Sequence, residues 1–194
     1  MKINKVIQKQ LNQQIKLNAK NKGYKARSCS LYKLKGDKFI HTNYLIVESK
    51  KIIFNIYIKK YSYDNIFWDI MQMSDNKKES DSLRAIGAFK APSILIKKGE
   101  YELSEDVVNL SNQFIEEVEL ASDNFIANNE INIYVLKTED EVDNEILKCL
   151  AYLDMKQYEQ AYEIAREAIG SGYRGRFENN GKGFFEWLLL ERKL

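Results

Sequence analysis

The sequence predicts an α+β protein in which an N-terminal helix covers an antiparallel sheet, followed by a C-terminal helical hairpin and a final helix. Three observations predict it: a helical apolar period at residues 2–21, apolar alternation at 52–60, and an alanine-rich helical pair at 151–169. With 194 residues, 44% of them hydrophobic, the chain can bury a sizeable core. We therefore expect an α+β domain at 1–137 and a helical subdomain at 138–194 packed on it.

The first helix is expected from Lys2 to about Asn21, because its apolar residues recur three and four positions apart and lysines and glutamines fill the other side. These apolar residues are Ile3, Val6, Ile7, Leu11 and Ile15. Gly23 is expected to end the helix. An extended piece follows at 31–34, and Lys35-Gly36-Asp37 predicts a turn into the sheet.

The two clearest strands are expected at 39–48 and 52–60, with Lys50-Lys51 between them. In the second strand, one row of alternate residues is wholly apolar and the other row is mixed. The apolar row is Ile52, Phe54, Ile56 and Ile58, and the mixed row is Ile53, Asn55, Tyr57 and Lys59. This pattern predicts a one-sided antiparallel sheet that the first helix covers.

The middle of the chain is less regular. Residues 61–73 fit a short helix better than a strand, and 83–89 and 94–97 are each expected to add a short strand. Pro92 marks a bend or a sheet edge between these two strands.

Three further elements complete the expected first domain and begin the second. Ser104 is expected to cap a helix that runs through Ala121. Residues 131–136 are expected to form the final strand, and Thr138-Glu139-Asp140-Glu141 is a capping box that predicts the start of the next helix.

The stretch from Ala151 to Ile169 has small residues where two antiparallel helices approach closely, and Tyr158 where an aromatic ring would fill their crossing. The small residues are Ala151, Ala161, Ala165 and Ala168. In this respect it resembles a single tetratricopeptide-type hairpin, although Lys156 stands where that family usually places glycine. A solenoid needs about three stacked repeats, so one copy implies a structural hairpin.

In outline, residues 1–137 resemble uncharacterised bacterial α+β families in which a helix leads into an antiparallel sheet. Some small proteins of that kind serve as immunity factors that mask a toxin. The resemblance implies a binding role and assigns no residue to it.

Charge is segregated along the chain, although the formal net charge is only +2. Residues 1–36 hold ten basic residues and no acid, and residues 100–145 hold fourteen acids against Lys137 alone. Either these segments face each other and neutralise within the fold, or they form separate faces that steer partners. The basic segment also fits a nucleic-acid interface, because lysines and arginines that neutralise phosphates release the counterions of the nucleic acid.

A glycine-rich stretch at 170–183 carries three bases, Arg174, Arg176 and Lys182. Its GxGxxG pattern follows a helix, whereas a dinucleotide fingerprint lies between a strand and a helix. Two interpretations stay open. Either the bases bind a phosphate or carboxylate, or the stretch caps one helix and connects it to the last helix at 184–192.

An aromatic run at 57–68 is a second candidate site, with Tyr61 and Tyr63 expected to be exposed and Trp68 in the core or at an interface. Tyrosine and tryptophan commonly supply the binding energy of protein interfaces. The same rings would suit stacking on nucleic-acid bases while Lys59 and Lys60 neutralise phosphates.

His41, the single histidine, lies in an expected strand and has no partner recognisable from sequence, which favours a structural role over acid-base catalysis. Cys29 and Cys149 are expected to be reduced and buried. The chain shows neither a Cys/His cluster with zinc spacing nor the spacing of a calcium loop. We therefore expect no metal site and no cofactor.

We expect a cytoplasmic protein that does not contact membranes, because neither a secretory signal nor an apolar stretch of membrane length is recognisable. The first functional hypothesis is a non-enzymatic protein that recognises a protein partner, of the immunity or regulatory kind. The residues expected to bind that partner are Tyr61, Tyr63, Trp68, Arg174, Arg176 and Lys182. The alternative is a nucleic-acid-binding protein or enzyme that uses the basic N-terminal segment.

Overall fold

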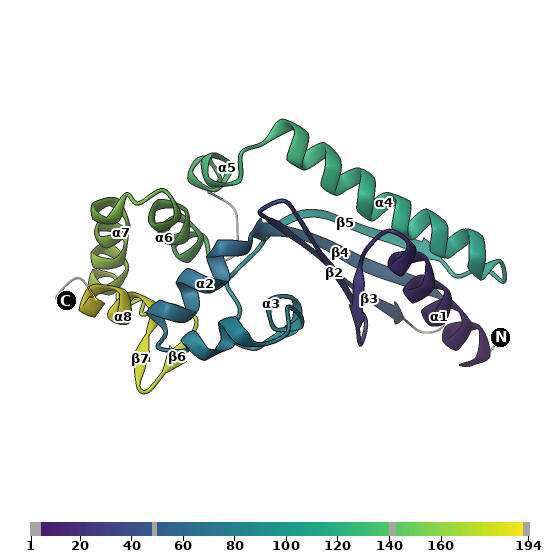
Figure 1. Ribbon diagram of the computed structural model, residues 1–194, viewed down its shortest axis with the longest axis horizontal. Coiled ribbons are helices and arrows are strands. Elements are labelled where there is room, and N and C mark those ends of the chain that lie inside the picture. The colour runs from purple at the N-terminus through teal and green to yellow at the C-terminus, as the bar shows by residue number, and fades with distance from the viewer. Residues whose placement is uncertain (1–4, 48–49, 140–142, 192–194) are drawn as a thin grey trace. The chain divides into compact units, whose positions relative to one another are not determined.

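The computed structural model describes residues 5–47, 50–139 and 143–191 (Figure 1). The chain forms two compact units, each assembled from two separate stretches. The first unit comprises Met1–Ile58 and Leu95–Asn128, and the second comprises Lys59–Ile94 and Asn129–Leu194. These boundaries differ from a division at residue 137, because residues 59–94 share a unit with the C-terminal helices.

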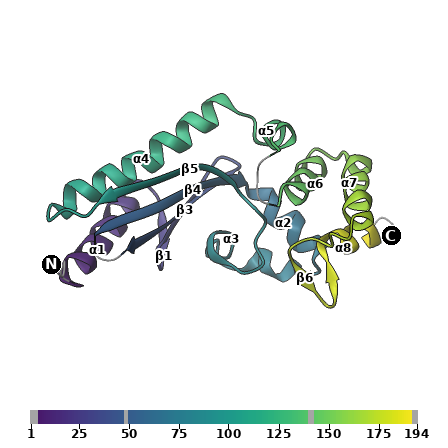
Figure 2. The same ribbon diagram turned by 180° about the vertical axis from the view of Figure 1, so that it is seen from behind.

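The first unit is a five-stranded antiparallel sheet, in the order β1-β2-β3-β4-β5, with the helices α1 (Lys5–Asn21) and α4 (Val107–Asn128). The strands are β1 (Lys25–Arg27), β2 (Ser30–Lys35), β3 (Lys38–Val47), β4 (Lys51–Lys60) and β5 (Ile94–Glu102). The two helices pack against each other and cover one face of the sheet (Figures 1 and 2). The predicted α+β class, with an N-terminal helix on an antiparallel sheet, is confirmed.

Aromatic rings fill the core between the sheet and α4. The Phe54 ring on β4 lies 5.0 Å from that of Phe114 and 5.5 Å from that of Tyr101, and Tyr44 on β3 lies 5.6 Å from Phe114. The predicted apolar row of β4 is buried throughout. Gly99 on β5 is required beside it, because a Cβ there would lie 2.3 Å from Phe54 Cζ.

The start of α4 differs from the predicted cap. Asp106 holds the capping position, because its carboxylate accepts a hydrogen bond of 3.0 Å from the backbone N–H of Asn109. Ser104 instead accepts a 3.1 Å bond from the backbone N–H of Asp106. The helix also continues past Ala121 to Asn128, with a buried face over most of its length.

The second unit is mainly helical. Its elements are α2 (Tyr61–Ile70), the 3₁₀ helix η1 (Ser74–Lys78), α3 (Ser82–Ile86), α5 (Ile131–Lys137), α6 (Asn144–Asp154), α7 (Tyr158–Gly170), the two-stranded ribbon of β6 (Glu178–Asn179) and β7 (Lys182–Gly183), and α8 (Phe184–Glu191). The helix predicted at 61–73 and the C-terminal helices are confirmed.

Two predicted strands of this unit are wrong. Residues 131–136 form α5, in which Ile131 and Val135 are buried four residues apart while Ile133 is 45% exposed. Glu130 stabilises the start of α5, because its carboxylate accepts a 2.8 Å hydrogen bond from the backbone N–H of Ile133. Residues 83–89 include most of the short helix α3 rather than a strand.

The connection into α6 also differs from the predicted capping box. Thr138 is the C-cap of α5, residues 140–142 lie outside the described residues, and α6 begins at Asn144 after Asp143, whose φ is 59°. The alanines of α6 and α7 are buried as expected. Tyr158, however, is 51% exposed and does not fill the helix crossing. The tetratricopeptide resemblance stays a prediction.

Candidate functional site

The aromatic run of α2 lies inside the second unit. Tyr63 is 0% exposed and Trp68 is 1% exposed, so the expectation of an exposed Tyr63 is wrong. The Tyr63 hydroxyl donates to Asn132 Oδ1 at 2.8 Å, and Trp68 Nε1 donates to the carbonyl oxygen of Phe89 at 2.6 Å. Burial, reinforced by Asp154 and Glu130, raises the pKa of Tyr63. Both rings therefore stabilise the unit.

Tyr61 is partly buried and lies against the guanidinium of Arg84. The guanidinium carbon lies 3.7 Å from the centre of the Tyr61 ring and 4.7 Å from that of Trp68. The Tyr61 hydroxyl donates to Asp81 at 2.9 Å. Tyr61 thus holds Arg84 from one side.

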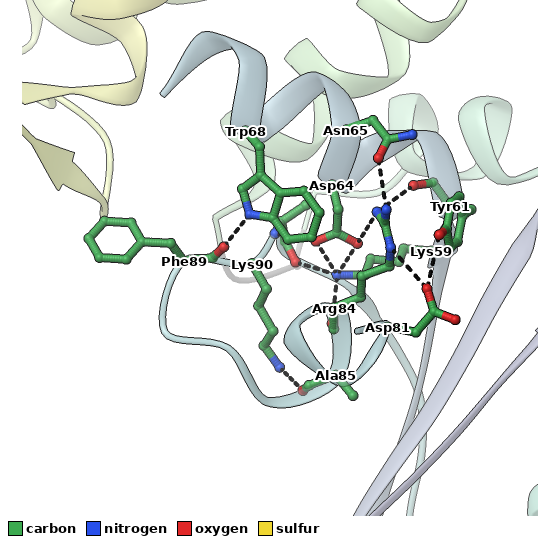
Figure 3. A network of polar contacts seen from close by, with 11 residues as sticks. Lys59, Tyr61, Asp64, Asn65, Trp68, Asp81, Arg84, Ala85, Phe89 and Lys90 are labelled. Atoms are coloured by element: carbon green, nitrogen blue, oxygen red, sulfur yellow. Dashed lines mark hydrogen bonds and ion pairs between the residues drawn. The ribbon is translucent and has the colours of Figure 1, made fainter. Parts of the chain in front are cut away.

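A buried lysine–aspartate pair organises this region (Figure 3). Lys59 Nζ lies 2.9 Å from each carboxylate oxygen of Asp64, and both side chains are 0% exposed. The same ammonium donates to the carbonyl oxygens of Arg84 and Ala91, at 3.0 Å each. Asp64 in turn accepts a 2.9 Å bond from the backbone N–H of Ala91. The pair therefore fastens the segment 84–91 to α2.

Arg84 completes this buried network. It donates to the carbonyl oxygen of Tyr61 at 3.2 Å and to Asn65 Oδ1 at 2.8 Å, and it lies 3.6 Å from Asp81. Burial lowers the pKa of Lys59, and Asp64 opposes this effect. Because the donors already have acceptors within the protein, the network holds chain segments together and presents no free nucleophile.

This network could not be predicted from the sequence. The sequence offered Lys59 only one role, the neutralisation of phosphates in the nucleic-acid alternative, because it neighbours the aromatic run. No spacing pattern relates Lys59 or Asp64 to Arg84, about twenty residues later. Their association depends on the path of the chain through α2 and α3.

Lys90 lies at the edge of the same network (Figure 3). Its ammonium donates to the carbonyl oxygen of Ala85 at 2.7 Å. Burial, followed by the charge of Lys59, lowers the pKa of Lys90 to about 8, and Arg176 acts in the same direction.

Lys90→Met is expected to raise the free energy of unfolding by about 1 kcal/mol at pH 7, because it removes an ammonium that the fold disfavours. The Lys90 pKa rises from about 8 in the folded protein to the ordinary 10.5 on unfolding. The unfolded chain therefore binds more protons between these pH values, and the wild-type penalty disappears as the pH rises. Urea titrations at pH 7.5 and 10 check this. A stability difference that does not shrink at pH 10 contradicts it.

A second polar cluster joins α2, α5 and α6 around Asp154. Its carboxylate accepts hydrogen bonds from Ser62 Oγ at 2.5 Å, Asn132 Nδ2 at 2.9 Å and Lys60 Nζ at 3.0 Å. Burial alone would raise the pKa of Asp154, but these donors outweigh burial and lower it. Asp154 is thus the common acceptor of the Ser62 hydroxyl and the Lys60 ammonium, and it links the end of β4 and α2 to α6.

The bases of the glycine-rich stretch contact groups of their own unit. Arg174 Nε donates to Glu186 at 2.7 Å, and its Nη2 donates to the carbonyl oxygen of Gly181 at 2.6 Å. Arg176 pairs with Asp143 at 3.1 Å, and Lys182 Nζ lies 4.9 Å from the centre of the Trp187 ring. These contacts favour the connector interpretation over a free anion site.

The acidic and basic segments meet within the first unit. Glu119 on α4 accepts hydrogen bonds from Lys33 at 2.5 Å and from the Tyr24 hydroxyl at 2.6 Å. Asp123 pairs with Lys35 at 2.7 Å, and Glu117 pairs with Lys97 of β5. Burial, followed by Glu119, raises the pKa of Tyr24. Part of the segregated charge is therefore neutralised inside the fold.

The lysines of α1 differ from these paired bases. All four are exposed and make no ion pair with another described residue. Lys9, Lys16 and Lys20 lie four, eleven and fifteen positions after Lys5. This spacing places all four on one helix face about 22 Å long. We call this set the lysine row: Lys5, Lys9, Lys16 and Lys20.

An exposed apolar pair flanks the lysine row on α1. Val6 is 53% exposed and Leu17 is 54% exposed. They are eleven residues apart, so they lie on one helix face next to the lysines. The opposite face of α1 buries Leu11, Ile15 and Ala19. α1 thus uses one face for the core and presents the other to solvent.

The remaining candidates from the sequence are the single histidine and the two cysteines. His41 is 1% exposed, and its ring stacks on Tyr57 with centroids 4.9 Å apart. Both cysteines are free, but Cys29 is exposed, so its expected burial is wrong; Cys149 is buried.

The described residues contain no group of three or more His, Cys, Asp or Glu side chains arranged to hold a metal ion. None of their helices combines the length and apolarity needed to cross a membrane. No protein-family model, curated protein or solved structure matches the chain.

Proposed function

We propose that this protein is a non-enzymatic binding protein whose lysine row recognises an acidic surface on a protein partner. One observation carries the proposal. In the basic N-terminal segment, Lys33 and Lys35 are paired with acids of α4, whereas the lysine row is exposed and unpaired within the described residues. Unpaired like charges on one rigid helix face attract an oppositely charged surface and orient it.

The flanking apolar pair favours a protein over a nucleic acid as the partner. Val6 and Leu17 offer apolar contacts next to the charges, as in protein interfaces that combine a polar rim with apolar anchors. Sequence-tolerant nucleic-acid binding instead uses aromatic rings that stack on bases. The described part of α1, KVIQKQLNQQIKLNAKN, contains no aromatic residue.

The mechanism that we propose has two steps. The lysine row first accelerates encounter with the acidic surface, and Val6 and Leu17 then lose their contact with water as the complex forms. The ionisable groups that the second unit gathers around Lys59 and Asp154 already serve the fold. Binding without conversion of the partner is the mode of an immunity or regulatory factor.

Affinity capture with charge-reversed variants tests this proposal. The variant Lys9→Glu/Lys16→Glu/Lys20→Glu reverses the lysine row. A matched control, Lys98→Glu/Lys137→Glu/Arg166→Glu, reverses three exposed bases elsewhere. Each variant replaces three positive charges by three negative ones, so the formal net charge falls from +2 to −4 in both. Nonspecific effects of net charge are therefore the same in the two variants. We expect a stoichiometric protein to copurify with the wild type and the control and to be lost from the row variant.

Two outcomes contradict the proposal. A partner that the row variant retains shows that α1 is not the interface. Nuclease-sensitive material that copurifies in place of a protein, with binding that falls steeply as salt rises, identifies a nucleic-acid partner. Circular dichroism of all three proteins checks that the substitutions leave the fold intact.

A further inference from the structure

Helix α4 is the acidic counterpart of α1 within the first unit. α1 holds four lysines and no acid, whereas α4 holds four acids and no base. The acids of α4 are Glu116, Glu117, Glu119 and Asp123. The two helices lie side by side on one face of the sheet (Figures 1 and 2), where Asn18 of α1 donates hydrogen bonds to Ser111 and Asn112 of α4. One layer of this unit therefore carries a basic helix next to an acidic one.

The exposed faces of the two helices share one spacing. On α1, four exposed residues follow one another at intervals of four, three and four positions, and we call them the α1 stripe: Val6, Gln10, Gln13 and Leu17. On α4, four exposed residues follow the same intervals, and we call them the α4 stripe: Asn109, Gln113, Glu116 and Leu120. Intervals of three and four positions keep side chains on one helix face. Each helix thus presents a stripe along which a second helix can lie.

Part of the acidity of α4 stays open to solvent. Glu116 is exposed and makes no ion pair with another described residue. Asp123 pairs with Lys35, but its side chain is still 50% exposed, and such surface pairs exchange partners at little cost. α4 therefore offers negative charge next to its exposed Leu120, as α1 offers positive charge next to Leu17.

We infer that the acidic surface recognised by the lysine row is α4 of a second copy of this chain. The inference rests on the proposed function, because it uses the same lysine row. A two-fold axis that runs along the two helices places α1 of each copy on α4 of the other, so every contact is made twice. An axis across the helices places α1 on α1 and brings like charges together. Charge therefore selects the first arrangement, in which both helix contacts are attractive.

The paired helices offer a contact of modest size. α1 has 17 residues. At the rise of an α-helix it is about 25 Å long, and two adjacent helices are about 20 Å wide. A face of about 500 Å² per copy is smaller than that of a standard protein interface. We therefore expect a dimer with a Kd on the order of micromolar, which salt weakens by screening the charges.

Sedimentation equilibrium of the purified protein, at concentrations from about 1 to 300 µM, tests the inference. We expect a monomer–dimer equilibrium in low salt that weakens at least about tenfold in high salt. The row variant should stay monomeric, and so should a stripe variant, Gln113→Lys/Glu116→Lys, because like charges meet in both. The matched control with three reversed bases elsewhere should dimerise as the wild type does.

Mixing the two charge variants gives the sharpest test. In a dimer of the row variant with the stripe variant, the reversed α1 meets the reversed α4, and the two unaltered helices meet each other. A tagged stripe variant should therefore capture the row variant. It should bind the matched control at least about tenfold less tightly, although the control has the same net charge as the row variant. Capture of the row variant also shows that both charge variants are folded.

The outcomes separate this inference from the proposed function. A wild type that stays monomeric over the whole concentration range overturns the inference, and so does a row variant that dimerises as the wild type does. If the wild type is monomeric while its lysine row captures a different protein from lysate, only the inference fails. If the captured protein is an untagged copy of this chain, both are supported.

Discussion

Asp64→Asn is expected to lower the free energy of unfolding by about 3–5 kcal/mol, because it leaves the Lys59 charge buried without a counter-charge. Both side chains are 0% exposed, so water cannot replace the lost partner. Lys59 and Asp64 also hold Ala91 from both sides of its backbone, and the variant weakens that attachment. Urea unfolding followed by tryptophan fluorescence measures the effect, since Trp68 and Trp187 both belong to the second unit.

Two control variants make this prediction specific. Asp75→Asn removes a carboxylate that is 97% exposed and paired with Lys78, so we expect a change within about 0.5 kcal/mol. Lys59→Met/Asp64→Leu removes both charges and should recover much of the stability that the single variant loses. A single variant as stable as Asp75→Asn would show that the buried pair does not stabilise the unit.

Phe114→Ala is expected to cost about 3–5 kcal/mol in the first unit, because it leaves a cavity where the ring meets Phe54 and Tyr44. Hydrogen exchange detected by mass spectrometry should show faster exchange in β3 and β4. The Phe114 ring contacts Tyr44 on β3 and Phe54 on β4, so its loss exposes these two strands first.

Leu120→Ala is the matched control on the same helix. Leu120 is 59% exposed, so its truncation removes little buried surface and should leave exchange in β3 and β4 unchanged. Equal effects of the two variants would contradict the assignment of Phe114 to the core.

The sheet was predictable because the apolar alternation in the sequence of its strands matches the burial of the same residues in the structure. The alternation of Ile52, Phe54, Ile56 and Ile58 gives a buried face on β4, and helix α1 follows its own apolar period. The strand predicted at residues 131–136 was wrong for a physical reason. Their β-branched alternation favours a strand, but the cap at Glu130 and the burial of Ile131 and Val135 at helical spacing decide for a helix.

The polar contacts were less predictable than the sheet, because they join residues far apart in sequence. Nothing in the sequence shows that Arg84 lies between the rings of Tyr61 and Trp68. The segregation of charge was visible in the sequence, but the sequence did not show which basic residues would pair with acids and which would stay exposed. Only the tertiary arrangement separates Lys33 and Lys35, which are paired, from the lysine row, which is open.

Isothermal titration of the captured partner tests the central claim most directly. It compares the wild type, the row variant Lys9→Glu/Lys16→Glu/Lys20→Glu and the matched control at two salt concentrations. We predict that the row variant loses about 100-fold or more in affinity and that the control keeps it, because three attractive contacts become repulsive only in the row variant. Equal affinities for all three proteins would contradict recognition through α1.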